Sequence, residues 1–194
     1  MKILVACEES QAVTIAFRNK GHEAYSCDIQ NCSGGHPEWH IKRDVKKVLN
    51  EKWDMIIAHP TCKYLANSGV SWIYKDKERI LKVKEAAEFF MIFYNHPCEK
   101  ICIENPIPHK YGELPKYTQI IQPFMFGHLE SKATCLWLKG LPKLKETNNV
   151  KDEMMKLPKN IRQRLHYLSP GPDREKLRSK TFQGIAEAMA EQWG

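Results

Sequence analysis

Three common motifs are missing from this sequence of 194 residues, and each absence excludes a class of protein. Its seven cysteines form no C-x-x-C pair, the spacing typical of zinc ribbons and dithiol redox sites, so we expect no metal site. Free thiols of this kind favour a reducing, cytoplasmic location. No apolar run reaches the roughly 18 residues that a membrane helix needs, so we expect no membrane partner. Repeats and low-complexity tracts are also absent, which favours a single domain over residues 1–194.

The glycine-rich loop that cradles phosphates in dinucleotide-binding proteins is the third missing motif. Residues 6–11 read "ACEESQ", without the G-x-G-x-x-G pattern. The carboxylates of Glu8 and Glu9 would repel a pyrophosphate, which argues against NAD, FAD and ATP. The same charges favour a ligand without phosphates that carries a sulfonium and an ammonium group, as S-adenosylmethionine does.

Positive charge is present in excess: the formal net charge is +7 and the isoelectric point is near 9.0. Such a balance suits a polyanionic partner, either a nucleic acid or a nucleotide. The basic residues are spread along the chain, so the charge permits this partner without identifying it.

Short apolar runs alternate with amphipathic segments along the chain. This alternation predicts an α/β fold with a doubly wound, mostly parallel sheet. The first helix would begin with Ser10 as its cap and end at Gly21. Strands are expected at 2–8, 22–29, 54–60 and 100–106, with a strand or hairpin at 133–141, and helices at 10–21, 44–53, 76–96 and 181–193.

Ligands of such sheets bind beyond the carboxyl ends of the strands, where this sequence places polar residues. Asp28 ends the second predicted strand, so its carboxylate could bind ribose hydroxyls or simply cap a turn. Asp44 opens a predicted helix, so it could cap that helix or accept a hydrogen bond from an adenine amine.

Cys62 lies just past the strand at 54–60, in the polar stretch "HPTCKYLANSG". It could be a packing thiol, the commoner fate of a lone cysteine. It could also be a nucleophile whose pKa is lowered by the N–H groups of the turn and a following helical segment. Glu104 likewise follows an apolar run, within the strand expected at 100–106. It could act as a general acid with a pKa raised by burial, or cap the turn formed by Asn105 and Pro106.

Taken in order, these segments resemble the DNA cytosine carbon-5 methyltransferase family, in a short form like those of phages and prophages. The similar segments are "FRNKGHEAYSCDI", "KRDVKKVL", "AHPTC", "IENP", "FMFGHLESKATCLWL" and "SKTFQGIAEAMAEQW". The last of them would return to pack beside the first helix. The stretch 145–176 is a small polar insertion where the family has a target-recognition domain.

The resemblance implies the Rossmann-like fold of class I S-adenosylmethionine-dependent methyltransferases. It also implies methyl transfer to carbon 5 of cytosine, on DNA and with little sequence selectivity. Cys62 would attack carbon 6 and Glu104 would bind the ring edge. The implied cofactor contacts are Cys7, Glu8, Glu9, Asp28, Ile29, Asp44, Val45 and Pro60, and the implied substrate contacts are Thr61, Asn105, Pro106, Lys132 and Thr134.

Two other functions stay open at this point. The short insertion fits an enzyme on the same scaffold that modifies a free pyrimidine nucleotide. The altered first loop fits a binding module that holds a nucleotide or a protein without performing chemistry.

Overall fold

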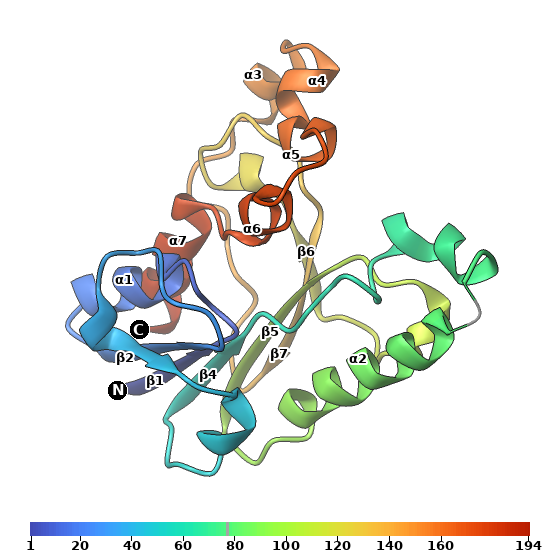
Figure 1. Ribbon diagram of the computed structural model, residues 1–194. Helices are drawn as coiled ribbons and strands as arrows, with labels where there is room; N and C mark the ends of the chain where they lie inside the picture. The colour runs from blue at the N-terminus through green and yellow to red at the C-terminus, as the bar shows by residue number, and fades with distance from the viewer. Residues whose placement is uncertain (77) are drawn as a thin grey trace.

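A seven-stranded sheet forms the centre of the protein in the computed structural model, which describes residues 1–76 and 78–194 (Figure 1). Its strands are β1 (Lys2–Ala6), β2 (Glu23–Asp28), β3 (His40–Lys42), β4 (Met55–Ala58), β5 (Lys100–Pro106), β6 (Gln119–Ile121) and β7 (Thr134–Lys139).

Helices and single turns connect the strands. The α-helices are α1 (Ala12–Asn19), α2 (Arg79–Tyr94), α3 (Lys151–Met155), α4 (Lys159–Arg162), α5 (Arg164–Tyr167), α6 (Arg174–Ser179) and α7 (Gln183–Trp193). The 3-10 segments are η1 (Pro37–Trp39), η2 (Val45–Lys47), η3 (Asn67–Tyr74), η4 (Lys110–Gly112) and η5 (Pro123–Met125).

The strand order is β3-β2-β1-β4-β5-β7-β6, and only the pairs that involve β7 are antiparallel. The chain adds β2 and β3 on one side of β1 and then returns to add β4 and the later strands on the other side. The topological switch point of the sheet therefore lies between β1 and β4. The predicted fold class is therefore confirmed as a doubly wound, mostly parallel α/β sheet of the Rossmann-like type.

Both faces of the sheet are covered, which explains why its central strands are apolar on both sides. In β1, Ile3 and Val5 face the core formed with α1 and α7, whereas Leu4 and Ala6 face the core formed with α2. Figure 1 shows these helices on opposite sides of the sheet. The predicted packing of the last helix beside the first is confirmed by the shared core of α1 and α7.

Two predictions about local structure are wrong. The helix expected at 44–53 is only the single turn η2, capped by the Asp44 carboxylate, which accepts from the Lys46 N–H. Ser10 does not cap α1, because the Glu8 carboxylate takes that place. The end of α1 is as predicted, since Gly21 adopts φ +83° and its N–H bonds to the Arg18 carbonyl.

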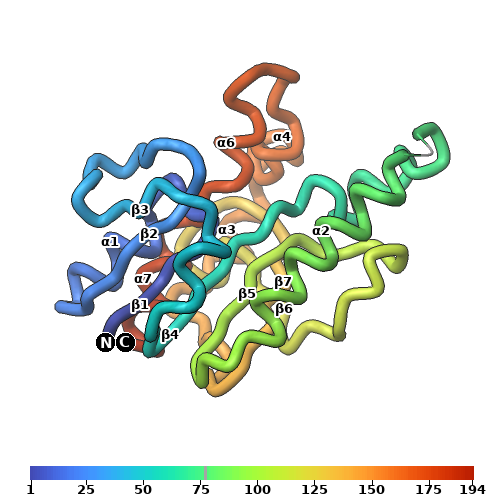
Figure 2. The backbone as a smooth tube through the Cα atoms, turned by 60° about the horizontal axis from the view of Figure 1, so that its bottom comes forward, coloured from blue at the N-terminus to red at the C-terminus, as the bar shows by residue number. Residues whose placement is uncertain are grey.

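The stretch 145–176 contains α3, α4, α5 and the first turn of α6. Figures 1 and 2 show these short helices stacked on one another, away from the chain termini. Among the described residues, no helix is long and apolar enough to cross a membrane.

Candidate active site

The loop after β1 has an unusual backbone. Cys7 and Gln11 both adopt φ 59°, a left-handed conformation that is uncommon for residues other than glycine. The Gln11 side chain holds this loop to the next one, because its Nε2 donates to the His36 carbonyl at 2.8 Å and its Oε1 accepts from the His36 N–H at 3.1 Å. Strain of this kind persists where the surrounding structure fixes it, and it is concentrated at functional sites.

The Glu8 carboxylate occupies the N-terminus of α1, the place where nucleotide-binding folds hold a phosphate of their ligand. This buried carboxylate accepts from the Val13 N–H at 2.7 Å and from both the N–H and the hydroxyl of Thr14. Burial raises the pKa of Glu8, while the charge of His59 and these hydrogen bonds act in the opposite direction. The N–H groups that bind phosphate in nucleotide-binding folds are therefore already occupied by the chain itself.

At the ends of β2 and β3, the expected cofactor contacts have different environments. Asp28 is half-buried and accepts from the Gln30 N–H at 2.9 Å, and the neighbouring Ile29 is 72% exposed. Asp44 caps η2, whereas Val45 is buried in the core on the α2 side of the sheet. Ile29 is thus open to a ligand and Val45 lies beneath the surface.

Cys62 is half-buried in the turn after β4, beside the buried Pro60 and the exposed Thr61. Burial raises the pKa of the Cys62 thiol, and the positive charges of Lys132 and Arg178 oppose that rise without cancelling it. The expected lowering of this pKa is wrong, because the turn is followed by 3-10 structure and supplies too little compensation for burial.

A histidine that we did not predict pairs with Glu104. His59 Nδ1 lies 3.0 Å from Glu104 Oε2, and both side chains are almost buried. Burial acts to raise the pKa of Glu104, but the hydrogen bond and charge of His59 outweigh it and the net shift is downward. Burial acts to lower the pKa of His59, and Glu104 reverses that effect so that the net shift is upward. The expectation of a raised pKa for Glu104 is therefore wrong, and the two residues form an ion pair.

The residues expected to contact a substrate surround this pair. Asn105 is buried and its Nδ2 donates to the Pro60 carbonyl at 2.9 Å, which joins the ends of β4 and β5. Lys132 donates to the Arg178 carbonyl at 2.8 Å and brings α6 over the site. Pro106 is half-buried, and Thr134 is buried with its hydroxyl directed to the Lys132 carbonyl.

Several buried polar atoms at this edge of the sheet have no hydrogen-bond partner. Within residues 1–76 and 78–194, four buried side-chain atoms lack a hydrogen bond, and three of them lie at the carboxyl ends of β1, β4 and β5. They are Glu9 Oε2, His59 Nε2 and Asn105 Oδ1. Buried polar groups are nearly always hydrogen-bonded, so three such atoms at one edge indicate a place for a ligand or ordered water.

A hollow of about 320 Å³ lies at the same edge. It is bounded by Glu9 and Ser33 on one side and by Asp173, Lys176, Leu177 and Lys180 of the α6 region on the other. Lys176 Nζ is 3.4 Å from Glu9 Oε2, a charge contact without hydrogen-bond alignment. The first loop and α6 therefore enclose a space lined by both signs of charge.

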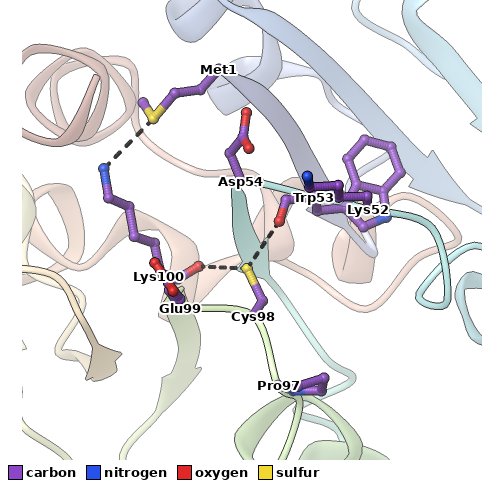
Figure 3. A pocket seen from close by; sticks show the side chains of 8 residues that line it. All are labelled: Met1, Lys52, Trp53, Asp54, Pro97, Cys98, Glu99 and Lys100. Carbon is purple, nitrogen blue, oxygen red and sulfur yellow. Dashed lines mark hydrogen bonds between the residues drawn. The ribbon is translucent and has the colours of Figure 1, made fainter.

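A larger hollow, of about 700 Å³, lies at the opposite edge of the sheet (Figure 3). Cys98 lines this hollow, and its thiol donates to the Trp53 and Lys100 carbonyls at 3.5 Å each. None of the predicted site residues lines it, so we place the candidate site at the carboxyl edge. Over the part of the chain that the structure describes, no group of three or more His, Cys, Asp or Glu side chains could hold a metal ion.

Two residues of this edge, His59 and Arg178, are not among the site residues that the sequence predicted. The signal for His59 was its place in "AHPTC", directly after an apolar strand, where a polar residue has no packing role. Arg178 was visible as a basic residue in a polar stretch, but only the folded chain shows α6 crossing to Lys132.

Comparison with known proteins identifies no family. No family model and no curated protein matches the chain. Among solved structures, it is similar to a prophage-encoded E. coli protein described as a DNA modification methyltransferase, with 13% identity, a TM-score of 0.47, and coverage of 81% of this chain and 55% of that one. It is also similar to the Entamoeba histolytica methyltransferase EhMeth, with 14% identity, a TM-score of 0.49, and coverage of 76% and 57%. The chain thus spans a little over half the length of either protein.

Proposed function

We propose that this protein transfers a methyl group from S-adenosylmethionine to carbon 5 of cytosine in DNA, through a covalent bond between Cys62 and the base. The observation that carries the proposal is the grouping of Cys62, the His59–Glu104 pair and Lys132 around unpartnered buried atoms. A nucleophile, an acid–base pair and a cation at one edge are the groups that this reaction requires.

Cys62 would act as the nucleophile. Its thiol must lose a proton before the sulfur bonds to carbon 6 of the ring, and the charges of Lys132 and Arg178 favour the thiolate. The new bond makes carbon 5 electron-rich. Carbon 5 takes the methyl group, and the donor departs as its neutral thioether. A solvent water then takes the proton of carbon 5, the electrons of that bond form the 5,6 double bond and expel the sulfur from carbon 6, and N3 returns its proton to Glu104, which restores Cys62.

The His59–Glu104 pair would manage the charge that develops on the ring. Attack at carbon 6 pushes electrons toward N3 of the cytosine. The proton shared between His59 and Glu104 can move onto the Glu104 carboxylate and be donated to N3, which neutralises that charge. The unpartnered Asn105 Oδ1 is suited to accept from an amino group of the base.

The carboxylates of the first loop match the charges of S-adenosylmethionine. S-adenosylmethionine supplies an electrophilic methyl group and carries no phosphate, in keeping with an α1 terminus already filled by Glu8. Glu9 Oε2 would accept from an ammonium group, Asp28 from hydroxyls, and the exposed Ile29 would cover an aromatic ring.

The test uses DNA that contains 5-fluorocytosine, together with the methyl donor. We expect an adduct that survives denaturing electrophoresis in the wild type and in the control variant Cys98→Ser, since Cys98 is a half-buried thiol at the opposite edge of the sheet. Cys62→Ser should form no adduct. Methylation of unmodified cytosine by Cys62→Ala would overturn the proposal, and parallel pools of RNA and free nucleotides would reveal a different substrate.

A further inference from the structure

An exposed group of aromatic side chains lies mainly on the segment that follows Cys62 in the chain, and the candidate site does not use it. The segment 64–76 projects beyond the first turn of α2 in both Figure 1 and Figure 2. Within it, Trp72 is 55% exposed and Tyr74 is 75% exposed. Tyr74 forms an edge-to-face contact and a hydroxyl hydrogen bond with Tyr111 of η4. We call Tyr64, Trp72, Tyr74 and Tyr111 the aromatic arm.

Three of the four rings of the arm have a cation near one face. Lys75 Nζ lies 5.1 Å from the centre of the Trp72 ring, and Lys110 Nζ lies 5.3 Å from that of Tyr111. Arg79 lies 5.1 Å from the Tyr64 ring. Asp76 lies between these residues in the chain, and its carboxylate accepts from the Glu78 N–H at 3.0 Å, just before the start of α2. Rings with adjacent cations form the pattern that binds unpaired bases and their phosphates together.

The arm is fixed to the catalytic turn. It begins two residues after Cys62, and the Leu65 and Ala66 N–H groups both donate to the Cys62 carbonyl. At its base, Ala66 pairs with Pro108, and the His109 ring bonds to the Tyr64 carbonyl at 2.7 Å. A strand that lies along the arm therefore leads directly to Cys62.

We propose that the aromatic arm binds single-stranded nucleic acid, with bases stacked on Trp72 and Tyr74 and phosphates on Lys75 and Lys110. If the proposed function holds, the arm makes unpaired DNA the preferred substrate. The binding of single strands does not depend on that function, since it is argued from the residues of the arm alone. The core of a protein–protein interface is depleted in lysine, whereas Lys75 and Lys110 lie directly at the rings of the arm.

The first measurement is the fluorescence anisotropy of a labelled oligothymidylate, without any methyl donor. We expect single strands to bind more tightly than a hairpin duplex of the same length. Trp72→Ala and Tyr74→Ala should each weaken binding by at least about 5-fold, since one stacked base is worth that much or more. Trp72→Phe should keep most of the affinity, and Tyr94→Ala, an exposed ring at the other end of α2, should keep all of it.

The second measurement is the salt dependence of that binding. Lys110→Gln should reduce the slope of log K against log salt by about 0.7, the value for one phosphate contact on a single strand. The control Lys52→Gln, exposed at the opposite edge of the sheet, should leave the slope unchanged.

Equal affinity of Trp72→Ala, Tyr74→Ala and the wild type for single strands would overturn the inference, as would a preference for duplex. Such a result would leave adduct formation by Cys62 intact on saturating DNA. Conversely, arm-dependent binding in a protein that forms no adduct would remove the proposed function and keep the arm.

Discussion

At the scale of single residues, burial raises the pKa of Cys62, whereas the pairing of His59 with Glu104 overcomes the effect of burial on both of those residues. The Cys62 thiol, the Glu104 carboxylate and the His59 ring are all removed from water, so each pays a desolvation cost when it ionises alone. His59 and Glu104 offset that cost in each other. The cations that lower the pKa of Cys62 are Lys132 and Arg178, and they do not cancel the effect of burial. The thiol therefore keeps its proton until a base removes it.

The pH profile of the reactivity of Cys62 toward iodoacetamide should therefore have its midpoint above the ordinary thiol pKa of 9.0. Because Lys132 lowers the pKa of Cys62, Lys132→Gln should move the midpoint of the profile to higher pH. Mass spectrometry of the peptide that contains Cys62 measures the rate separately from the other thiols. A profile with its midpoint near neutral pH would contradict the burial of this sulfur.

The contribution of the His59–Glu104 pair to the stability of the folded protein should depend on pH and be largest within a defined range. The raised pKa of His59 contributes stability that is complete below its ordinary value of 6.5 and is lost as pH rises through the folded-state pKa. The lowered pKa of Glu104 contributes stability that is complete above 4.5 and is lost as pH falls through the folded-state pKa. The contribution of the pair is thus largest between about pH 4.5 and 6.5.

His59→Gln tests that window, because it leaves the Glu104 carboxylate buried without its partner. We expect a loss of about 3 kcal/mol in the free energy of unfolding near pH 5.5, measured by urea denaturation, and smaller losses on either side. The control His166→Gln, exposed on α5, should change stability little. A loss independent of pH would mean that His59 contributes by packing alone.

At the scale of elements, the first loop is held in place by its neighbours. Gly34 lies so close to it that a Cβ atom would sit 2.5 Å from the Gln11 Cβ and 2.7 Å from the Ser10 carbonyl oxygen. The loop at 33–36 thus supports the shape of the β1 turn and, with it, the position of Glu9. The Ser33 N–H bond to the Glu9 carbonyl, at 2.8 Å, adds to this support.

Gly34→Ala should displace the first loop, because both close contacts involve atoms near or on the backbone. We expect a loss of stability of about 1–3 kcal/mol and weaker binding of S-adenosylmethionine by calorimetry. Gly171→Ala, which adds a methyl group where no atom lies within 4 Å, is the matched control. Equal calorimetric affinity in both variants would show that the loop is not part of the cofactor site.

The sequence predicted elements better than contacts. The run "KICIENP" corresponds to β5 residue for residue, because its apolar centre, Ile101 to Ile103, is typical of a strand that is covered on both faces. The helix at 44–53 failed because Asp44 and the following lysines favour a capped turn, and the buried Val48 and Leu49 satisfy the core without a second turn. No local pattern could place Arg178 over Cys62, since that approach depends on how residues 145–180 fold back.

At the scale of the whole molecule, the two cores share one sheet. The core containing Phe17 and the core containing Phe90 lie on opposite faces, and alternate residues of β1 and β4 belong to each. Neither core can open without exposing the strands that support the other. The chain should therefore unfold as one cooperative unit.

Phe17→Leu and Phe90→Leu test this coupling. Each should cost roughly 1–3 kcal/mol, and far-ultraviolet circular dichroism and tryptophan fluorescence should give coincident transitions in both variants. Because the two rings contact different cores, the double variant should lose the sum of the two costs to within about 0.5 kcal/mol. Separate transitions for the two probes would mean that the faces unfold independently.

The position of the chain ends has a practical consequence. The Met1 amino group lies 3.4 Å from one nitrogen of the His22 ring, and Gly194 lies against the other. Figure 2 shows the two ends side by side. β1 starts here and ends at Ala6 on the opposite edge of the sheet, so an anchor attached at either end of the chain holds the molecule by the edge where β1 begins. A biosensor surface loaded through such a tether would present Cys62 and Trp72 to the flowing analyte without steric obstruction from the support.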